Sequence, residues 1–433
     1  MVNLGQANGP ASQTIVVVGG GIAGITAAAE AAESGQDVIL LEKGPSLGGR
    51  VAALHRYFPK LCSPACGLEI NYQRLRANRR IRILTMCEVT RVAGGRGAFS
   101  VSVKRRPRHV NDKCTACGDC AAVCETTVPN PFNHELDRVK AARLAHEHAF
   151  PARYLISPEA IAAGEGQKLQ AACRYGAIEP EEKEESFELG AGAIVWATGW
   201  QPYDARRIDV YRYGHSADII TNVQMERLAA ADGPTKGRIV RPSNGQPATK
   251  VALVQCAGSR DINHLPYCSR ICCLASLKHA AYVREQYADA TVDIYYIDLR
   301  AHDKLEAFYE KLRADPQVRF IKSKPAHIRF APDGRPVLHG ERTVDHQMYA
   351  EAYDLVVLAT GMQPVVPQGW QPGWGILQDE YGFLVASTEP DGLCPAGVAT
   401  APLDVSMSVQ SATAAALKAL RAVRGSGSRG PKG

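Results

Sequence analysis

Four cysteines near the middle of the chain have the residue type and spacing to hold a metal centre. Their pattern is Cys-x11-Cys-x3-Cys-Cys, formed by Cys256, Cys268, Cys272 and Cys273. They follow a hydrophobic strand expected at 251–255 and lead into a helix expected from about 272 to 287. In a nucleotide-binding fold this turn carries the glycine loop that approaches a pyrophosphate. Thiolates in place of that loop favour an iron–sulfur cluster. This part of the protein would then receive electrons from a cluster rather than from a nicotinamide.

The spacing of these four cysteines leaves their metal open. Cys268 and Cys272 lie one helical turn apart and share a face, whereas the adjacent Cys272 and Cys273 diverge. A cluster therefore requires an irregular start to the helix. Buried structural thiols fit the same spacing equally well.

A second group of cysteines has the spacing of half a bacterial ferredoxin. Cys114, Cys117, Cys120 and Cys124 are separated by two, two and three residues. In two-cluster ferredoxins the fourth cysteine binds the other cluster, and the second half returns one cysteine in exchange. That half is expected at Ala171-Ala-Cys-Arg-Tyr-Gly-Ala-Ile178. We therefore expect one 4Fe–4S cluster held by Cys114, Cys117, Cys120 and Cys173.

Other arrangements of the same cysteines stay open. The rival ligand set uses Cys124 in place of Cys173, which puts all four ligands on one short loop. A zinc site is a further alternative, although the three-residue period suits a cluster better than paired zinc knuckles. Cys62 and Cys66 could form a redox pair, but their spacing with an intervening proline favours unbridged thiols.

The N-terminal part of the chain carries a dinucleotide-binding fingerprint. Gly19, Gly21 and Gly24 form G-x-G-x-x-G between an expected strand at 15–18 and a helix that runs to about 34. The glycines allow a tight turn, close approach of the backbone to a pyrophosphate, and helix–strand packing. Glu42, at the end of the next strand, is placed to bind ribose hydroxyls.

Features after Glu42 favour FAD over NAD. Gly48-Gly-Arg50 follows the acid, and two strands end in Ala-Thr-Gly, at 197–199 and 359–361. Flavoproteins with two dinucleotide domains, such as thioredoxin reductase, usually close the flavin site with Gly-Asp, but here Val398 follows Gly397. Asp404 or Ser406 is then expected to take the place of that aspartate at the flavin site. The expected FAD site comprises Gly19, Gly21, Ile22, Ala23, Gly24, Glu42, Lys43, Gly49, Arg50, Val89, Thr198, Gly199, Gly361, Gly397, Asp404 and Ser406.

These elements predict an α/β fold with two dinucleotide-binding domains, like that of thioredoxin and glutathione reductases, and an inserted ferredoxin-like α+β domain. The first part of the FAD domain is expected at 11–107 and the ferredoxin-like insertion at 108–182. The FAD domain and a connector resume at 183–245. A second Rossmann-like domain with the cysteine cluster follows at 246–364, the last FAD segment at 365–423 and a flexible tail at 424–433.

Composition narrows the possible functions. No secretion signal precedes residue 15, and the apolar run 15–32 contains four glycines and Glu30, so it fits strand, turn and helix rather than a membrane span. Thirteen cysteines without such a signal indicate metal or redox work. The net charge of +6 is modest, and the basic segment 104–108 indicates a solvated face or an acidic partner rather than nucleic acid.

The motifs resemble the A subunit of heterodisulfide reductase over roughly residues 14–420. The segments that carry the likeness are Gly48-Gly-Arg50, Cys114-Thr-Ala-Cys-Gly-Asp-Cys120, Gln255-Cys-Ala-Gly-Ser-Arg-Asp261 and Tyr267-Cys-Ser-Arg-Ile-Cys-Cys273. In that family the second cysteine segment holds an unusually ligated 4Fe–4S cluster near FAD. The resemblance therefore implies FAD and two 4Fe–4S clusters, with Cys256, Cys268, Cys272 and Cys273 as ligands of the second.

Four further segments resemble the A subunit of the quinone-interacting membrane-bound oxidoreductase. They are Phe58–Asn71, Val128–Asn133, Thr221–Leu228 and Asp261–Tyr267. This likeness implies electron transfer between adenylylsulfate reductase and the quinone pool in sulfur metabolism. The implied partners are adenylylsulfate reductase, a second flavin/iron–sulfur protein and a haem-containing membrane protein. The chain would then be cytoplasmic and touch the membrane only through a partner, with no residue catalytic beyond the cofactors.

Two other functions stay open at this point. One is that of the A subunit in a cytoplasmic heterodisulfide reductase-like complex, in sulfur oxidation or flavin-based electron bifurcation. The other is a self-sufficient NAD(P)H-dependent disulfide reductase. The second needs a glycine loop near 251–273 and a Cys-x2-Cys or Cys-x4-Cys pair, and the sequence provides neither there nor at Cys62 and Cys66.

Overall fold

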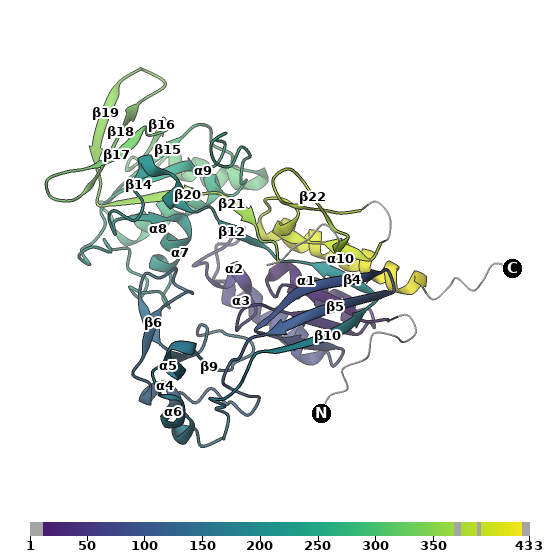
Figure 1. Ribbon diagram of the computed structural model, residues 1–433. Coiled ribbons are helices and arrows are strands. Elements are labelled where there is room, and N and C mark those ends of the chain that lie inside the picture. The colour runs from purple at the N-terminus through teal and green to yellow at the C-terminus, as the bar shows by residue number, and fades with distance from the viewer. Residues whose placement is uncertain (1–11, 368–373, 388–390, 427–433) are drawn as a thin grey trace. The chain divides into compact units, whose positions relative to one another are not determined.

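The computed structural model describes residues 12–367, 374–387 and 391–426. Within them the chain divides into two compact units, each described here by itself. Unit 1 takes in Met1–Ala52, Ser63–Trp200 and Pro364–Gly433, and unit 2 takes in Ala53–Cys62 and Gln201–Gln363. Each unit is built on a five-stranded parallel sheet (Figure 1).

The sheet of unit 1 has the strand order β24-β11-β1-β2-β3. Its strands are short and apolar because both faces are covered. They are β1 (Ile15–Val18), β2 (Val38–Leu41), β3 (Ile81–Leu84), β11 (Ala193–Trp196) and β24 (Leu393–Pro395).

Three helices cover one face of this sheet. α1 (Ile22–Glu33) packs against α10 (Val405–Ser426) and α3 (Pro64–Ala77), and the short α2 (Gly49–Ala52) precedes α3. The contact between α1 and α10 is lined largely by alanines, among them Ala27, Ala31 and Ala419. Such small side chains let the two helix backbones approach closely while they bury Ile15 and Val17 beneath them.

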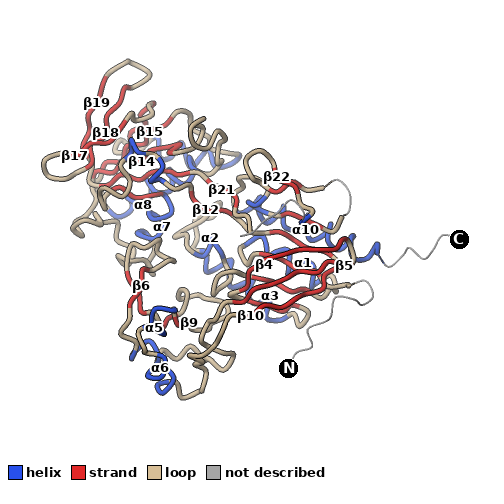
Figure 2. The backbone as a smooth tube through the Cα atoms, viewed as in Figure 1, coloured by secondary structure: helices blue, strands red, loops and turns tan. Residues whose placement is uncertain are grey.

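A three-stranded antiparallel sheet covers the opposite face of unit 1. Its order is β10-β5-β4, formed by β4 (Cys87–Gly95), β5 (Ala98–Arg105) and β10 (Glu185–Ala191) (Figure 2). Alternate residues of β5, Phe99, Val101 and Val103, pack on Val16 and Val18 of the parallel sheet. Buried and more exposed side chains alternate along these strands because the other face of the sheet meets solvent.

The segment between β5 and β10 forms small elements around a core of its own. They are α4 (Asp119–Val123), β6 (Thr127–Pro129), β7 (Arg138–Lys140), β8 (Ala142–Arg143), β9 (Leu155–Ile156), α5 (Pro158–Ala162) and α6 (Gly166–Ala172). Val110, Cys120, Cys124, Leu169 and Ile178 belong to this core. By its contacts the segment groups with unit 1, and its assignment as an inserted domain stays a prediction.

Unit 2 repeats the parallel design with the order β13-β20-β14-β15-β16. The strands are β13 (Ile219–Thr221), β14 (Lys250–Ala257), β15 (Thr291–Tyr296), β16 (Val318–Lys322) and β20 (Leu355–Thr360). One face packs on Tyr203, Tyr211, Ile328 and Leu338. The last two belong to an antiparallel sheet of β17 (His327–Phe330), β18 (Pro336–Glu341) and β19 (Met348–Ala352).

Helices pack on this parallel sheet as well. α8 (Cys272–Gln286) connects β14 to β15 and contacts α7 (Asn222–Ala229) and α9 (Glu306–Arg313). α7 begins at residue 222 because the Gln224 side chain accepts a hydrogen bond from the Thr221 backbone N–H at 2.9 Å, which caps the helix. Short ribbons complete the chain: β12 (Trp200–Pro202) with β21 (Met362–Pro364), and β22 (Leu377–Gln378) with β23 (Leu384–Val385).

A buried ion cluster joins α7 to α8. Glu226 contacts the Nζ atom of Lys278 at 2.9 Å and Nε2 of His279 at 2.7 Å, and all three side chains are almost fully enclosed. Glu226 also accepts a hydrogen bond from the backbone N–H of His55 at 2.9 Å, and Lys278 donates to the carbonyl of Arg56 at 2.5 Å. These bonds hold segment 53–62 in unit 2. Despite burial, the charge of Lys278 and the hydrogen bond from His279 keep the pKa of Glu226 below its usual range.

Replacing Glu226 with glutamine should destabilise unit 2 strongly. The change leaves the buried Lys278 charge without its partner, a loss that typically costs about 3–5 kcal/mol. Glu285→Gln is the matched control, because Glu285 pairs with Arg56 at the surface and such pairs contribute about 0–1 kcal/mol. Thermal or urea unfolding of the two variants measures the difference, and equal losses would contradict the role of the cluster. Because the folded-state pKa of Glu226 is depressed, its contribution should be lost as the pH falls below the unfolded carboxyl pKa of about 4.3.

Candidate functional site

The glycine turn of unit 1 leaves space at one position and none at two others. A Cβ atom on Gly19, whose φ is +106°, would lie 2.2 Å from the Ala197 carbonyl oxygen. One on Gly24 would lie 1.7 Å from the Gly19 carbonyl oxygen. At Gly21 a Cβ would meet only the Gly49 Cα, at 4.0 Å. The open side of Gly21 thus faces the backbone of the Gly48-Gly-Arg50 motif, with which it forms a bridge at Gly48.

The Glu42 carboxylate, at the end of β2, hydrogen bonds to the backbone of two loops. Its Oε2 accepts a hydrogen bond from the backbone N–H of Gly20 at 2.6 Å, and its Oε1 accepts one from Gly44 at 2.6 Å. Burial raises the pKa of this carboxyl, and the two N–H donors oppose that rise. A carboxylate has further lone pairs for ribose hydroxyls. Together with the N-terminus of α1, the open glycine turn fits an anionic dinucleotide.

The other predicted flavin-site residues of unit 1 occupy several local settings. Arg50 donates from Nε to the Trp200 carbonyl at 3.3 Å and lies over the Trp200 ring. Thr198 donates to the Val365 carbonyl at 2.6 Å, and the Val365 N–H in turn donates to the Gly199 carbonyl at 3.1 Å. Ile22 and Ala23 open α1, Val89 is buried in β4, and Lys43 forms an exposed ion pair with Glu88.

The C-terminal end of the expected flavin site is closed by residues outside the motif. Gly397 has φ +64°, and a Cβ on it would lie 2.6 Å from that of Ala23. Its N–H donates to the Ser411 hydroxyl at 3.0 Å. Asp404 accepts a hydrogen bond from Met407 at 2.8 Å and so caps α10, while Ser406 is exposed. Ser411 was not foreseen, because no local motif marks a helix residue fourteen positions from the glycine it contacts.

Gly361 belongs to unit 2 and packs against the cysteine-bearing loop there. A Cβ on Gly361 would lie 2.1 Å from the Ser259 hydroxyl and 2.6 Å from that of Ser269. The two serines hydrogen bond each other at 3.2 Å. Its predicted role toward a flavin stays a prediction, and its observed role is close packing beside Cys256 and Cys268.

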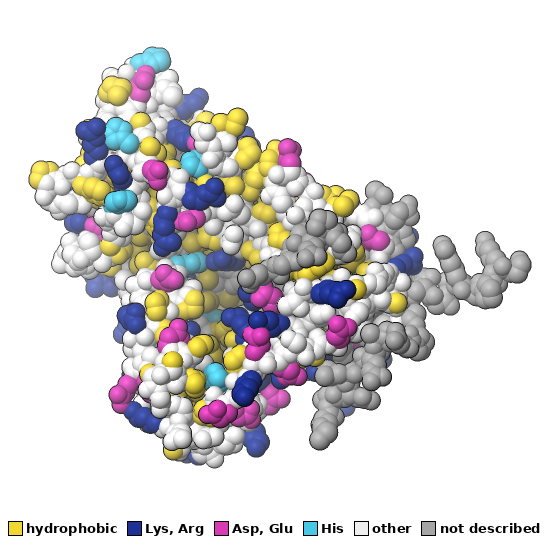
Figure 3. Space-filling model, in the orientation of Figure 1, with side chains coloured by type: hydrophobic (Ala, Val, Ile, Leu, Met, Phe, Trp, Pro, Cys, Tyr) yellow, Lys and Arg dark blue, Asp and Glu magenta, His cyan; other side chains and the backbone are white. Residues whose placement is uncertain are grey.

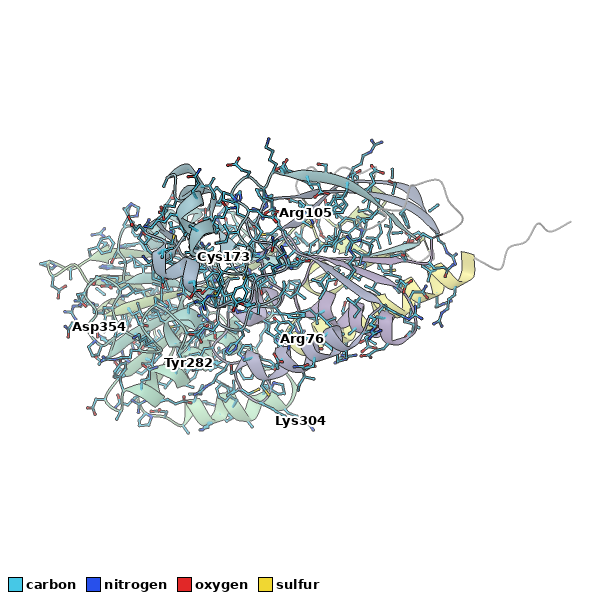
Figure 4. The ribbon with its side chains drawn as sticks, turned by 90° about the horizontal axis from the view of Figure 1, so that it is seen from below. Arg76, Arg105, Cys173, Tyr282, Lys304 and Asp354 are labelled. Carbon is cyan, nitrogen blue, oxygen red and sulfur yellow. The ribbon has the colours of Figure 1, made fainter. Side chains whose placement is uncertain are left out.

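Four cysteines line one pocket in the inserted segment of unit 1. They are Cys114, Cys117, Cys120 and Cys173, with Tyr154 and Tyr175 among the other lining residues. Cys173 ends α6, where Figure 4 labels it, and its Sγ accepts a hydrogen bond from the Ala177 N–H at 3.3 Å. Cys124 does not line the pocket, and its buried Sγ lies 3.5 Å from the Thr126 carbonyl oxygen. The pocket thus gathers the crossed ligand set expected from ferredoxin spacing.

The second cysteine set lies at the turn from β14 into α8. Cys256 sits on a bulge of β14 with φ +55°. Cys268 precedes α8, and the nearby Arg270 has φ +63°, so the stretch before the helix is irregular. Cys272 and Cys273 are the first residues of α8, and their thiols lie 3.8 Å from the carbonyl oxygens of Thr360 and Asp298. The irregularity thus precedes the helix, while Cys272 and Cys273 themselves lie in its first turn, and their role as ligands stays a prediction.

Burial favours the protonated form of four of these thiols. It raises the pKa of Cys120 and of Cys273 to about 11, and it raises the pKa of Cys256 and Cys272 as well. Negative charge on the other cysteines of each set adds to the rise. Iron supplies the compensating positive charge, so both sets fit a cluster. In the described part of the chain, no three His, Cys, Asp or Glu side chains are arranged around a single metal ion.

Two of the four basic residues in segment 104–108 form ion pairs. Lys104 pairs with Glu184 at 2.8 Å, and Arg105 pairs with Glu185 at 2.5 Å. Arg108 is buried and donates to the carbonyls of Arg153 and Tyr154. On the face drawn in Figure 3, basic side chains lie among acidic ones.

Comparisons with known proteins agree with a flavin site at the glycine turn of unit 1. A family model described as FAD dependent oxidoreductase matches residues 14–73, which hold the glycine turn, Glu42 and Arg50. The chain is 37% identical over 432 residues to the A subunit of the ferredoxin/F(420)H(2)-dependent CoB-CoM heterodisulfide reductase of Methanosarcina acetivorans, covering 96% of this chain and 54% of that protein. It is 36% identical to a heterodisulfide reductase iron-sulfur A subunit of Methanopyrus kandleri, covering 94% and 64% respectively.

The homologues of the chain are thus A subunits of heterodisulfide reductase, of whose length it spans about half to two thirds. Both findings confirm that the chain is an oxidoreductase component. None of the described helices has the length and apolar character needed to cross a membrane.

Solved structures confirm the predicted fold class. Lactococcus lactis thioredoxin reductase superposes with a TM-score of 0.53 at 14% identity, covering 96% of this chain and all of that one. Thioredoxin reductase of T. acidophilum gives 0.51 at 14% identity, covering 94% and 98%. Both have the fold with two dinucleotide-binding domains that the sequence predicts.

Substituting alanine at Gly21 and at Gly24 should separate ligand binding from folding. Gly21→Ala fills only open space in the empty turn, so we expect unchanged thermal stability without FAD and at least roughly tenfold weaker FAD binding. Gly24→Ala forces α1 away from β1, and such overpacking costs about 1–3 kcal/mol. Flavin absorbance per protein and thermal unfolding of the flavin-free protein measure the two effects. Full flavin content in Gly21→Ala would contradict a dinucleotide at this turn.

Proposed function

We propose that the chain is the FAD and iron–sulfur electron-transfer component, the A subunit, of a heterodisulfide reductase-like complex. The observation that carries the proposal is the turn from β14 into α8, where Cys256, Cys268, Cys272 and Cys273 stand in place of a glycine loop. The second dinucleotide-like unit thereby has residues for a cluster where a nicotinamide-binding protein has residues for phosphates. The identity to heterodisulfide reductase A subunits supports this reading.

The proposed cofactors are one FAD and two 4Fe–4S clusters. FAD, when bound, exchanges electrons in pairs or singly, whereas iron–sulfur clusters carry single electrons. The chain itself would hold and orient these groups. Gly21 and Glu42 would accept the dinucleotide, the pocket of Cys114, Cys117, Cys120 and Cys173 one cluster, and the turn before α8 the other.

A second candidate function is that of the A subunit in the quinone-interacting membrane-bound oxidoreductase. It is favoured by the segments Phe58–Asn71, Val128–Asn133, Thr221–Leu228 and Asp261–Tyr267. The proposed partners are then adenylylsulfate reductase, a second flavin/iron–sulfur protein and a haem-containing membrane protein, which would make the membrane contact for a cytoplasmic chain. Reduction of the purified complex by sulfite and AMP through adenylylsulfate reductase would support this candidate, and reoxidation by a heterodisulfide alone would support the first.

The metal content of anaerobically prepared protein tests the proposal directly. We expect about eight irons and eight acid-labile sulfides per FAD, because each 4Fe–4S cluster contributes four of each. NADH should leave the bound flavin oxidised, since the turn at 256–273 lacks a glycine loop. Bleaching of the flavin by NADH alone, with no iron bound, would replace the proposal with a self-sufficient disulfide reductase.

Two cysteine variants test the ligands of the ferredoxin-type cluster. Cys173→Ser should lower the iron content by about four per chain, because the pocket loses a ligand. Cys124→Ser is the matched control and should keep its iron, since Cys124 lies outside the pocket. Iron analysis and electron paramagnetic resonance of the reduced proteins measure the cluster content of both variants. The reverse result would assign the fourth ligand to Cys124.

A further inference from the structure

One buried side chain beside the second cysteine set has no partner among the described residues. Gln255 is 2% exposed, and neither its Nε2 nor its Oε1 atom forms a hydrogen bond there. Leaving buried polar groups unpaired is costly, so native structures nearly always satisfy them. Both ends of this amide are therefore expected to face something other than the chain itself.

The strand places Gln255 on the helix-covered side of the sheet. Ala252 and Val254 pack in the core with Tyr295 and Leu358, a core to which α8 contributes no residue. Side chains alternate along a strand, so Gln255 projects from the other face. α8 packs against β14, β15 and β20, and it follows β14 in the chain, so its first turn lies near the end of that strand.

That first turn carries the cysteines. Cys272 opens α8, and its Sγ lies 3.8 Å from the carbonyl oxygen of Thr360. A bulge sets Gln255 and Cys256 together between the paired positions Val254 and Ala257, next to the end of β20. Gln255, Cys256 and Cys272 thus converge on the ends of two neighbouring strands.

Other polar side chains in this layer already have partners. Asn222 donates to the Thr360 carbonyl at 3.3 Å and accepts from the Thr360 hydroxyl at 3.0 Å. Ser269 accepts from the Met362 N–H at 2.9 Å. Two donors beside the cysteines stay unused among the described residues, the Gln255 amide and Nε of Arg270, and Gln255 is the one with both polar atoms of its side chain unpaired.

We propose that the Gln255 side-chain amide donates an N–H hydrogen bond to a sulfur of the cluster held by Cys256, Cys268, Cys272 and Cys273. This role rests on the proposed function, because it requires that second cluster. Hydrogen bonds to sulfur stabilise the more negative, reduced cluster and so raise its reduction potential. Gln255 is then a tuning residue, which sets how readily this centre accepts an electron.

The test is a redox titration of the anaerobic holoprotein, monitored by electron paramagnetic resonance. Gln255→Met keeps the length of the side chain and removes its donor. We expect the reduced-to-oxidised ratio of the second cluster at a fixed potential to fall roughly tenfold, which is a 59 mV shift for a one-electron couple. The ferredoxin-type cluster, identified as the signal lost in Cys173→Ser, should keep its potential.

Two controls distinguish tuning from a structural effect. Gln286→Met makes the same change at the other end of α8, where Gln286 bonds only to Ile239 and Gly237, and should leave both potentials unchanged. Gln255→Glu keeps the side-chain shape and replaces the donor with an acceptor, so it should lower the potential further. If Gln255→Met loses its iron, a wild-type potential in Gln255→Glu overturns the proposal.

The remaining outcomes separate this inference from the proposed function. Wild-type potentials for both clusters in Gln255→Met, with about eight irons retained, overturn the tuning role and leave the function intact. About four irons in the wild-type protein would remove the second cluster itself, and with it the role of Gln255.

Discussion

The close approach of a strand end to the start of the following helix is the constraint on which both units depend. In a parallel sheet the first strand must turn directly into a helix that packs back on the sheet. In unit 1 this turn has no room for side chains at Gly19 and Gly24, and open space only at Gly21. In unit 2 the corresponding turn is longer, bulged at Cys256 and irregular before Cys272. One topology therefore provides a cradle for phosphates in one unit and a convergence of thiols in the other.

The Glu226 cluster and the second cysteine set differ in how their buried polar groups are balanced. Glu226 and Lys278 neutralise each other, and His279 bonds to the same carboxylate. Bonds from Glu226 and Lys278 to the backbone at His55 and Arg56 connect a distant segment to the helices. Burial raises the pKa of three thiols of the second set, and negative charge on the neighbouring cysteines raises each of them further. The ion cluster is complete within the chain, whereas the cysteine turn is suited to a charge brought from outside.

Local patterns in the sequence predicted most of the elements. The strand at 15–18 and the helices at 22–33 and 272–286 lie within a residue or so of their expected positions. Each is specified by short-range periodicity and by glycine or an acid at its end. Ferredoxin spacing also led us to expect Cys173 beside Cys114, Cys117 and Cys120, and the four line one pocket. Their role as ligands stays a prediction.

Features set by distant contacts were not predictable in this way. Segment 53–62 joins unit 2 through bonds to Glu226 and Lys278, which lie more than 170 residues away. Gly361 repeats a local Ala-Thr-Gly pattern but packs on Ser259 and Ser269. The single β-bulge at Gln255 and Cys256 leaves no periodic signal in the sequence, because one inserted residue looks like ordinary strand.

Unequal enclosure of the two cysteine sets has a consequence for how each would meet its surroundings. In the first set Cys117 is exposed, Cys114 and Cys173 are half-buried and Cys120 is buried. In the second set only Cys268 is half-buried, and Cys256, Cys272 and Cys273 are buried. Dissolved oxygen and chelators reach an exposed thiolate far more readily than an enclosed one. A metal centre in the ferredoxin-like pocket would be the one open to exchange with other molecules and the first to decay in air, while one at the start of α8 would be sheltered.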